Sequence, residues 1–358
     1  MSYSAEEVKA ALKGVQDPDL KRDLVELGMI GEVTCEGKSI ELTVELTTPA
    51  CPLKDKIGDD ITAALKERLG AEAVSINWTA NTQSQGPDAS ELIPGVKNIV
   101  LIASGKGGVG KSTISANVAT VLAAHGAAVG LLDADVYGPS IPTMFDIHNQ
   151  PQATEDQRIL PHVKFGLKIM SMGFLLEAGQ PVIWRGPMLD SAMQQFLGQV
   201  DWGELDYLII DLPPGTGDVQ LSLSRMTPGA EAVVVTTPQD VALADVERAI
   251  GMFKTVGLST LGVVENMSGF ICGHCGERTD IFGRGAGKKA AEKYGLTDLG
   301  SVPLTEKVVH SGDAGRPITV SDPDDPAAVA LSAVAGAIAQ RLAIRASEKE
   351  PAEAGRSS

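Results

Sequence analysis

The sequence has few cysteines, few aromatic residues and a shortage of positive charge. Four cysteines in 358 residues are too few for a disulfide scaffold, so we expect a reducing, cytoplasmic setting. Aromatic residues make up 4% of the chain, which leaves little for stacking on nucleic-acid bases. The net charge of −16 opposes binding to nucleic acid or anionic lipid. We therefore expect protein and small-molecule partners, and neither nucleic acid nor a membrane.

Signals for export or membrane insertion are also missing. Residues 1–10 lack the basic and apolar regions of a signal peptide, and we find no uncharged apolar stretch long enough to span a bilayer. The alanine-rich segment 326–346 could form an amphipathic membrane helix, but its basic residues are only Arg341 and Arg345, and an acidic tail follows. We expect a final packing helix there and a disordered tail over 347–358.

Hydrophobic patterning predicts two domains. Residues 1–80 form a small α+β unit, with helices expected at 5–12 and 53–69 and strands at 30–34, 40–46 and 74–78. Residues 81–95 are polar and rich in turn formers, as in a linker. Over 96–346 helical stretches alternate with apolar strands, expected at 98–103, 128–132, 168–170, 207–210, 232–236 and 261–264. This alternation predicts an α/β domain with a doubly wound, mostly parallel sheet, whose ligand lies at the carboxyl ends of the strands.

A phosphate-binding loop occupies residues 105–112, which read GKGGVGKS. In this pattern backbone N–H groups surround a phosphate, Lys111 reaches the β and γ oxygens, and the Ser112 hydroxyl ligates Mg²⁺. An expected strand precedes the loop and an expected helix, 112–124, follows it, so the phosphate would lie at a helix N-terminus. The predicted nucleotide-binding residues of the loop are Gly105, Lys106, Gly107, Gly108, Val109, Gly110, Lys111, Ser112 and Thr113.

Lys106 is a second lysine that the pattern does not require. Two ammonium groups from one short loop would repel each other over the same oxygens, so we expect Lys106 to point away from Lys111. A lysine supplied to a second molecule would neutralise charge on the transferred phosphoryl group, as arginine fingers do. Lys106 therefore favours nucleotide hydrolysis in a dimer. The alternative is a solvated surface lysine.

Carboxylates end two of the expected strands. Asp211 follows an apolar run and matches the aspartate that holds Mg²⁺ through its water shell. Asp133 and Asp135 have the alternate spacing that points both side chains to one side of an extended segment, where one can position the attacking water. Asp218 closes the glycine-rich loop after Asp211. Helix capping and turn formation are the alternative roles, above all for Asp133 and Asp218.

Cys272 and Cys275 form a C-x-x-C motif among glycines, with His274 as a spacer. A tetrahedral zinc or a cubane cluster requires four ligands, and the chain has no second C-x-x-C. A two-fold axis would supply the other two thiolates from a second subunit. A redox-active cysteine pair and a zinc site remain alternatives.

The other two cysteines lie in the first domain. Cys51 precedes Pro52, and a proline at the first helical position would put Cys51 at or near the N-cap of the 53–69 helix. The helix terminus would favour a thiolate there, so Cys51 is a candidate reactive thiol, with a buried cap residue as the alternative. Cys35 gives no functional signal.

These motifs together resemble the Mrp family of iron-sulfur cluster carrier ATPases, relatives of MinD and ParA with a deviant Walker A motif. The resemblance covers about residues 95–340 and is carried by GKGGVGKST at 105–113, DADVYGPS at 133–140, WRGPM at 184–188, DLPPGTGD at 211–218, ENMS at 265–268 and CGHC at 272–275. Residues 1–80, with Asp17-Pro18 and TPACP at 48–52, resemble the PaaD-like domain fused to many bacterial members.

The resemblance implies a role for each catalytic candidate in binding and hydrolysing ATP. Lys106 would act across the dimer, and Lys111 and Ser112 would hold phosphate and Mg²⁺. Asp135 would position the attacking water, and Asp211 would be the Walker B aspartate.

The resemblance also implies an adenine contact and a cargo. Asn266 would recognise adenine, and Cys272 with Cys275 would hold a [4Fe-4S] cluster shared by the two subunits. The expected partners are a second copy of the chain, cluster scaffold proteins and apo iron-sulfur proteins. Three other functions remain open: a positioning ATPase of the MinD or ParA type, a dimer with a structural zinc, and a reductase like the nitrogenase iron protein.

Overall fold

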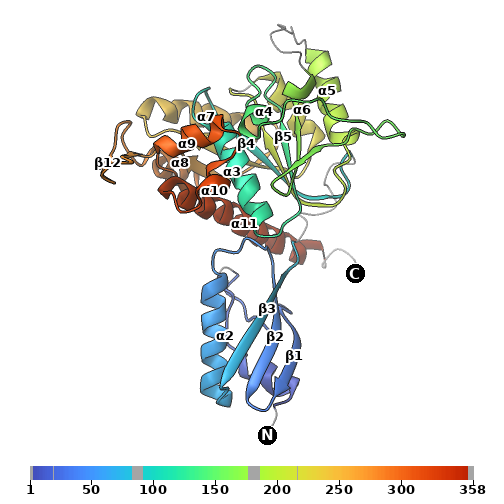
Figure 1. The fold of residues 1–358 in the computed structure, drawn as a ribbon, viewed down its shortest axis with the longest axis vertical. Helices are drawn as coiled ribbons and strands as arrows, with labels where there is room; N and C mark the ends of the chain where they lie inside the picture. The colour runs from blue at the N-terminus through green and yellow to red at the C-terminus, as the bar shows by residue number, and fades with distance from the viewer. Residues whose placement is uncertain (1–2, 19, 83–91, 176–185, 216, 354–358) are drawn as a thin grey trace. The chain divides into compact units, whose positions relative to one another are not determined.

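The computed structural model describes residues 3–18, 20–82, 92–175, 186–215 and 217–353 (Figure 1). They belong to two compact units. The smaller unit combines Met1–Gln83 with Ala339–Ser358, and the larger one is Ser84–Ile338.

The N-terminal part of the smaller unit, Met1–Gln83, is a three-stranded sheet with two helices. Strands β1 (Ile30–Glu36) and β2 (Ser39–Leu46) pair antiparallel, and β2 pairs parallel with β3 (Ala73–Ala80). Helix α2 (Lys54–Leu69) connects the two parallel strands, as such a connection requires, and α1 (Ala5–Ala11) packs beside α2. The expected small α+β domain is therefore present.

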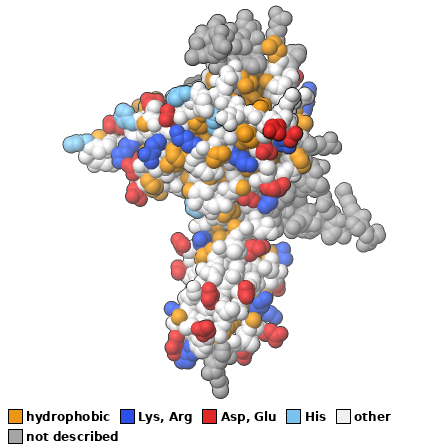
Figure 2. Space-filling model, turned by 45° about the vertical axis from the view of Figure 1, so that its right-hand side comes forward, with side chains coloured by type: hydrophobic (Ala, Val, Ile, Leu, Met, Phe, Trp, Pro, Cys, Tyr) orange, Lys and Arg blue, Asp and Glu red, His pale blue; other side chains and the backbone are white. Residues whose placement is uncertain are grey.

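Residue periodicity explains this packing. Strand β2 buries every second side chain, as a strand with one covered face must. Helix α2 buries the positions one turn apart that face the sheet. The buried residues of β2 and α2 are Ile40, Leu42, Val44, Leu46, Ile57, Ile61, Ala64 and Leu65. On the face shown in Figure 2, acidic and basic side chains are interspersed over this unit.

The larger unit is built on an eight-stranded sheet in the order β13-β10-β9-β4-β8-β5-β7-β6. All neighbouring strands pair parallel except β6 and β7. The strands are β4 (Val96–Ala103), β5 (Val129–Asp133), β6 (His162–Lys164), β7 (Leu167–Ser171), β8 (Leu205–Asp211), β9 (Glu231–Thr236), β10 (Ser259–Glu265) and β13 (Thr297–Ser301). This is the doubly wound, mostly parallel sheet that the sequence predicts.

Helices flank this sheet (Figure 1). They are α3 (Lys111–Ala124), α4 (Ile141–Met144), the 3₁₀ turn η1 (Met172–Leu175), α5 (Gly186–Gly198), α6 (Asp218–Met226), α7 (Asp240–Thr255), α8 (Ala286–Tyr294), α9 (Glu306–Asp313), α10 (Ile318–Ser321) and the first part of α11 (Pro326–Glu353), up to Ile338. The central strands β5 and β9 are buried at every position, so both faces of the sheet are covered. The expected strands are near-continuous apolar runs for this reason.

The structure corrects two expectations about the end of the chain. Helix α11 continues to Glu353, past residue 346, where we expected a disordered tail to begin. Its Pro326–Glu348 stretch is also long and apolar enough to cross a membrane, with a mean hydropathy of 1.7, although we expected no such segment. Half of this stretch is buried in the structure, as in the core helix of a folded domain.

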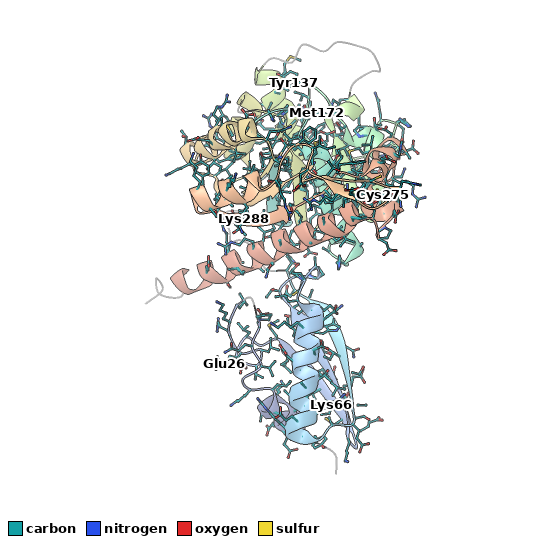
Figure 3. All side chains as sticks on the ribbon, turned by 90° about the vertical axis from the view of Figure 1, so that its left-hand side faces the viewer. Glu26, Lys66, Tyr137, Met172, Cys275 and Lys288 are labelled. Atoms are coloured by element: carbon teal, nitrogen blue, oxygen red, sulfur yellow. The ribbon has the colours of Figure 1, made fainter. Side chains whose placement is uncertain are left out.

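The smaller unit's core yields a stability prediction. Ile61 on α2 is fully buried, so Ile61→Ala should lower the unfolding free energy of this unit by about 2–5 kcal/mol through lost burial and a cavity. Urea unfolding of the full chain, followed through the fluorescence of Trp78 beside this core, measures the change. The exposed Lys66→Ala on the same helix is the control (Figure 3), and an equal loss in both variants would contradict the assignment.

Candidate functional site

The phosphate loop lies between β4 and α3, and three of its glycines, Gly105, Gly108 and Gly110, are required by sterics or backbone conformation. Gly108 and Gly110 have φ angles of +77° and +78°, which favour glycine. A Cβ at Gly105 would overlap the Asp245 carbonyl, and one at Gly110 would overlap the Asn266 amide. Gly110 is also the N-cap of α3, so the loop delivers its backbone directly to a helix N-terminus. Such a terminus binds anions through its free N–H groups and its dipole.

Lys111 is a buried ammonium group among carboxylates. Its Nζ lies 2.8 Å from Asp211 Oδ1 and 4.0 Å from Asp135 Oδ2, and its side chain is 6% exposed. Among the described residues Nζ nevertheless has no hydrogen bond of good geometry. Burying an ammonium is costly without partners, so these N–H groups are available to an anionic ligand. The residues present therefore fit a bound phosphate.

Asp211 ends β8 and is held by two hydroxyl groups of α3. Ser112 Oγ donates to its Oδ2 at 2.6 Å, and Ser115 Oγ donates to its Oδ1 at 2.7 Å. We had not singled out Ser115, although its place one turn after Lys111 was a usable signal. Ser112 and Asp211 present the hydroxyl and carboxylate oxygens that Mg²⁺ prefers.

Asp133, which ends β5, and Asp135, two residues after it, have different roles. Asp135 lines the cavity, and its Oδ1 accepts hydrogen bonds from the backbone N–H groups of Tyr137 and Gly138. Asp133 is fully buried and accepts hydrogen bonds from the N–H groups of Asp135 and Ile141. Asp133 therefore organises the turn, which was its alternative role, and Asp135 is the carboxylate that lines the cavity.

The segment after β10 carries the ENMS motif. Asn266 Nδ2 donates to the Val109 carbonyl of the phosphate loop at 2.9 Å. Glu265 is buried and accepts hydrogen bonds from Gly285 N and Gly287 N at the start of α8, and from Ser268 Oγ. Glu265 thus has a structural role that we had not assigned, and Asn266 links the phosphate loop to this segment.

The phosphate loop, Asp135 and Asn266 line one cavity of about 620 Å³. It lies at the carboxyl ends of β4, β5, β8 and β10, where a doubly wound sheet binds its ligands. Lys106 lines it and is half-buried, without an ion pair in the described chain. The other lining residues are Ser104, Gly107, Gly108, Val109, Gly110, Lys111, Ser112, Thr113, Asp135, Gly138, Pro139, Ser140, Thr143, Met144, Pro214, Asn266, Met267, Val302, Pro303, Leu304, Val308, Val309, Gly312, Asp313 and Leu331.

The C-x-x-C motif forms the turn of a two-stranded hairpin, β11 (Phe270–Ile271) and β12 (Arg278–Thr279), which projects from the larger unit in Figure 1. Cys272 N–H donates to Glu277 O at 3.0 Å, and Gly276 N–H donates to Cys272 O at 2.8 Å. Cys272 is half-buried and Cys275 is exposed. Cys275 is labelled in Figure 3.

Hydrogen bonds in this turn favour a thiolate. The backbone N–H groups of Cys275 and His274, then the Cys275 thiol, lower the pKa of Cys272. Within the residues that the structure covers, no three metal-ligating side chains come together. At this turn one chain therefore supplies two thiol ligands, the same number that the C-x-x-C motif indicates.

Three candidate features differ from expectation or lie outside the described residues. Helix α2 begins at Lys54 with Leu53 as its N-cap, so the expected capping position of Cys51 is wrong. The chain makes a turn before the helix begins, in which Lys54 N–H donates a hydrogen bond to Cys51 O. Cys51 packs instead beside the core of the smaller unit. The Asp218 side chain and residues 184–185 of the WRGPM motif lie outside the described residues.

The phosphate loop, its buried lysine and the strand-end aspartate on a parallel sheet define a P-loop NTPase. The chain belongs to the family described as "NUBPL iron-transfer P-loop NTPase", whose model matches residues 95–339. Residues 5–78 match a second family model, described as "Iron-sulfur cluster assembly protein". The expected relationship to iron-sulfur cluster carrier ATPases is confirmed.

Individual relatives agree with this assignment. An iron-sulfur cluster carrier protein of Synechocystis sp. is 49% identical and covers 95% of this chain and 98% of its own length. A solved nucleotide-binding protein from Archaeoglobus fulgidus in complex with ADP is 40% identical, with a TM-score of 0.57, over 63% of this chain and 89% of that one. The cell division ATPase MinD of Pyrococcus furiosus, at 21% identity, shares the fold, with a TM-score of 0.51 over 67% of this chain and 98% of that one.

Asp133 predicts a pH dependence of stability. Burial, and then the charge of Asp211, raise its pKa from 3.8 to about 7 in the folded chain. The folded state thus binds a proton more tightly than the unfolded state, and this contribution to stability is lost as the pH rises from about 4 to about 7. Asp133→Asn should flatten the fall in unfolding temperature over this interval. The exposed Asp156→Asn is the control, and a slope unchanged by Asp133→Asn would refute the prediction.

Proposed function

We propose that this protein is a cytoplasmic, homodimeric ATPase that assembles a [4Fe-4S] cluster at its interface and transfers it to apo-proteins. The observation that carries the proposal is the hairpin with Cys272 and Cys275, which presents two thiols beside a nucleotide cavity. A cubane cluster requires four ligands, and a second hairpin related by two-fold symmetry supplies the missing pair. The relatives named as iron-sulfur cluster carriers support this cargo.

The nucleotide site supports ATP hydrolysis. Lys111 would contact the β- and γ-phosphates, and Asn266 would contact adenine. Ser112 and Asp211 would hold Mg²⁺, which neutralises charge on the phosphate oxygens when bound. Asp135 would accept a hydrogen bond from the water that attacks the γ-phosphorus as the bond to the ADP oxygen breaks. Lys106 would reach the partner's nucleotide, so that hydrolysis depends on the dimer.

The cluster test is anaerobic reconstitution with iron and sulfide. We expect about four irons and four sulfides per wild-type dimer, with visible absorption, because one cubane needs four thiolates. The Cys272→Ala, Cys275→Ala double variant should lose both iron and colour, yet still bind nucleotide. The Cys35→Ala, Cys51→Ala variant is a matched control that removes the other two cysteines and should keep the cluster. A colourless wild type holding zinc would reject the cargo and favour the structural-metal alternative.

The hydrolysis test is Lys106→Ala. We expect the turnover rate to fall roughly a thousandfold, because trans-acting cations contribute about this much to phosphoryl transfer. ATP affinity should stay near that of the wild type, since Lys111 remains. Phosphate release and equilibrium nucleotide binding measure the two quantities, with Lys288→Ala on α8 as the control (Figure 3). Undiminished turnover in Lys106→Ala would remove the argument for a lysine acting in trans.

A further inference from the structure

The nucleotide cavity and the C-x-x-C hairpin are joined by a short segment, residues 266–271. At one end, Asn266 bonds to the phosphate loop through Val109 O, and Met267 lines the cavity. At the other end, the segment becomes strand β11, and Cys272 follows directly. A movement at the nucleotide therefore has a covalent path of six residues to the first cysteine.

Arg278 ties this segment to the opposite strand of the hairpin. It lies on β12, where it pairs with Ile271 of β11. Its Nη2 donates to Ser268 O at 2.7 Å, and its Nε donates to Asp280 Oδ1 at 3.1 Å. The charge on the guanidinium makes these strong, directional hydrogen bonds. Arg278 thus connects β12, the strand that follows Cys275, to Ser268, which lies two residues after Asn266.

Backbone hydrogen bonds also connect the joining segment to residues 302–304. Ser268 N–H donates to Val302 O, Leu304 N–H donates to Gly269 O, and Ile271 N–H donates to Leu304 O. Val302 and Leu304 also line the nucleotide cavity. The wall of the cavity and the base of the hairpin therefore share backbone hydrogen bonds.

The backbone of the joining segment is unusual at two positions. Met267 has a φ of +56°, a left-handed conformation that is costly for a residue with a side chain, and Gly269 has a φ of +77°. A Cβ at Gly269 would lie 2.6 Å from Arg278 Nε, so glycine is required for the arginine to pass. The segment thus has a strained residue, Met267, at the cavity, and a glycine, Gly269, where the Arg278 side chain packs closely against the backbone.

We propose that Arg278 is a positioning residue that transmits the nucleotide state of the cavity to the turn bearing Cys272 and Cys275. The joining segment moves with Asn266 and Met267, and Arg278 makes both strands of the hairpin follow. The spacing of the thiolates, and with it the rate of cluster release, then depends on the bound nucleotide. This inference rests on the proposed function, because the cluster is its cargo.

The release test uses the reconstituted, full-length dimer and an iron chelator. In the wild type we expect release rates with ATP and with ADP to differ by roughly fivefold or more, the usual scale of coupling between sites. In Arg278→Leu the ratio should fall to below about twofold, while cluster content and nucleotide affinity stay at wild-type levels. Arg278→Lys should retain an intermediate ratio, because an ammonium group keeps the charge but loses the two-armed geometry.

Two further variants separate coupling from loss of charge or of folding. Arg284→Leu removes an arginine that is exposed and has no ion pair in the part of the chain that the structure covers, and it should keep the wild-type ratio. Asp280→Asn keeps the arginine but weakens the hydrogen bond that orients it, so it should also reduce the ratio. This variant tests the coupling even if Arg278→Leu does not fold. A wild-type ratio in both Arg278→Leu and Asp280→Asn would overturn the proposal.

Hydrogen exchange of the cluster-free full chain tests the role of Arg278 independently of whether the protein carries a cluster. ATP should change the exchange of hairpin amides 270–279 in the wild type and in Arg284→Leu, but not in Arg278→Leu. If no cluster assembles on the wild type, the proposed function fails and this exchange still decides on the coupling. If a cluster assembles but ATP alters hairpin exchange equally in the wild type and Arg278→Leu, or in neither, the coupling is refuted.

Discussion

The burial of the Lys111 ammonium group is the constraint on which the rest of the site depends. An ammonium taken out of water requires compensating charge, and Asp211 at the end of β8 and Asp135 just after β5 supply it. Asp211 in turn requires the hydroxyls of Ser112 and Ser115. The phosphate loop, the first turn of α3 and the ends of β5 and β8 are therefore one electrostatic unit, and an anionic ligand completes it.

The parallel sheet brings these groups together. Since β4, β5, β8 and β10 run in the same direction, their carboxyl ends deliver Lys111, Asp135, Asp211 and Asn266 to a single edge. The same edge continues through residues 266–271 to the cysteine hairpin. A fold that binds nucleotide at strand ends thus carries a thiol pair on the next loop, and this arrangement makes coupling between the two physically direct.

Local patterns predicted most of the fold. Alternating burial on β2, the helical spacing of α2 and the apolar runs of β4 and β8 each reflect an environment that acts within a few residues. Expectations failed where a boundary depends on neighbours. The turn before Lys54 displaces Cys51 from the N-cap, and α11 continues beyond residue 346. The hairpin strands β11 and β12 have only two residues each, too few for a periodic signal.

The sequence by itself determined the phosphate loop and the thiol pair, because each is a contiguous motif whose geometry is set by backbone and side chains within about one turn. Tertiary structure decided which distant groups serve them. Ser115 and Asp211 are 96 positions apart, and Asn266 and Val109 are 157 apart, so no local pattern records their contacts. Only the packed sheet directs Asp133 into the protein and Asp135 toward the cavity, and only the folded hairpin brings Arg278 to Ser268. The motifs depend on residues that are close in sequence, whereas long-range packing brings together the distant residues that orient them.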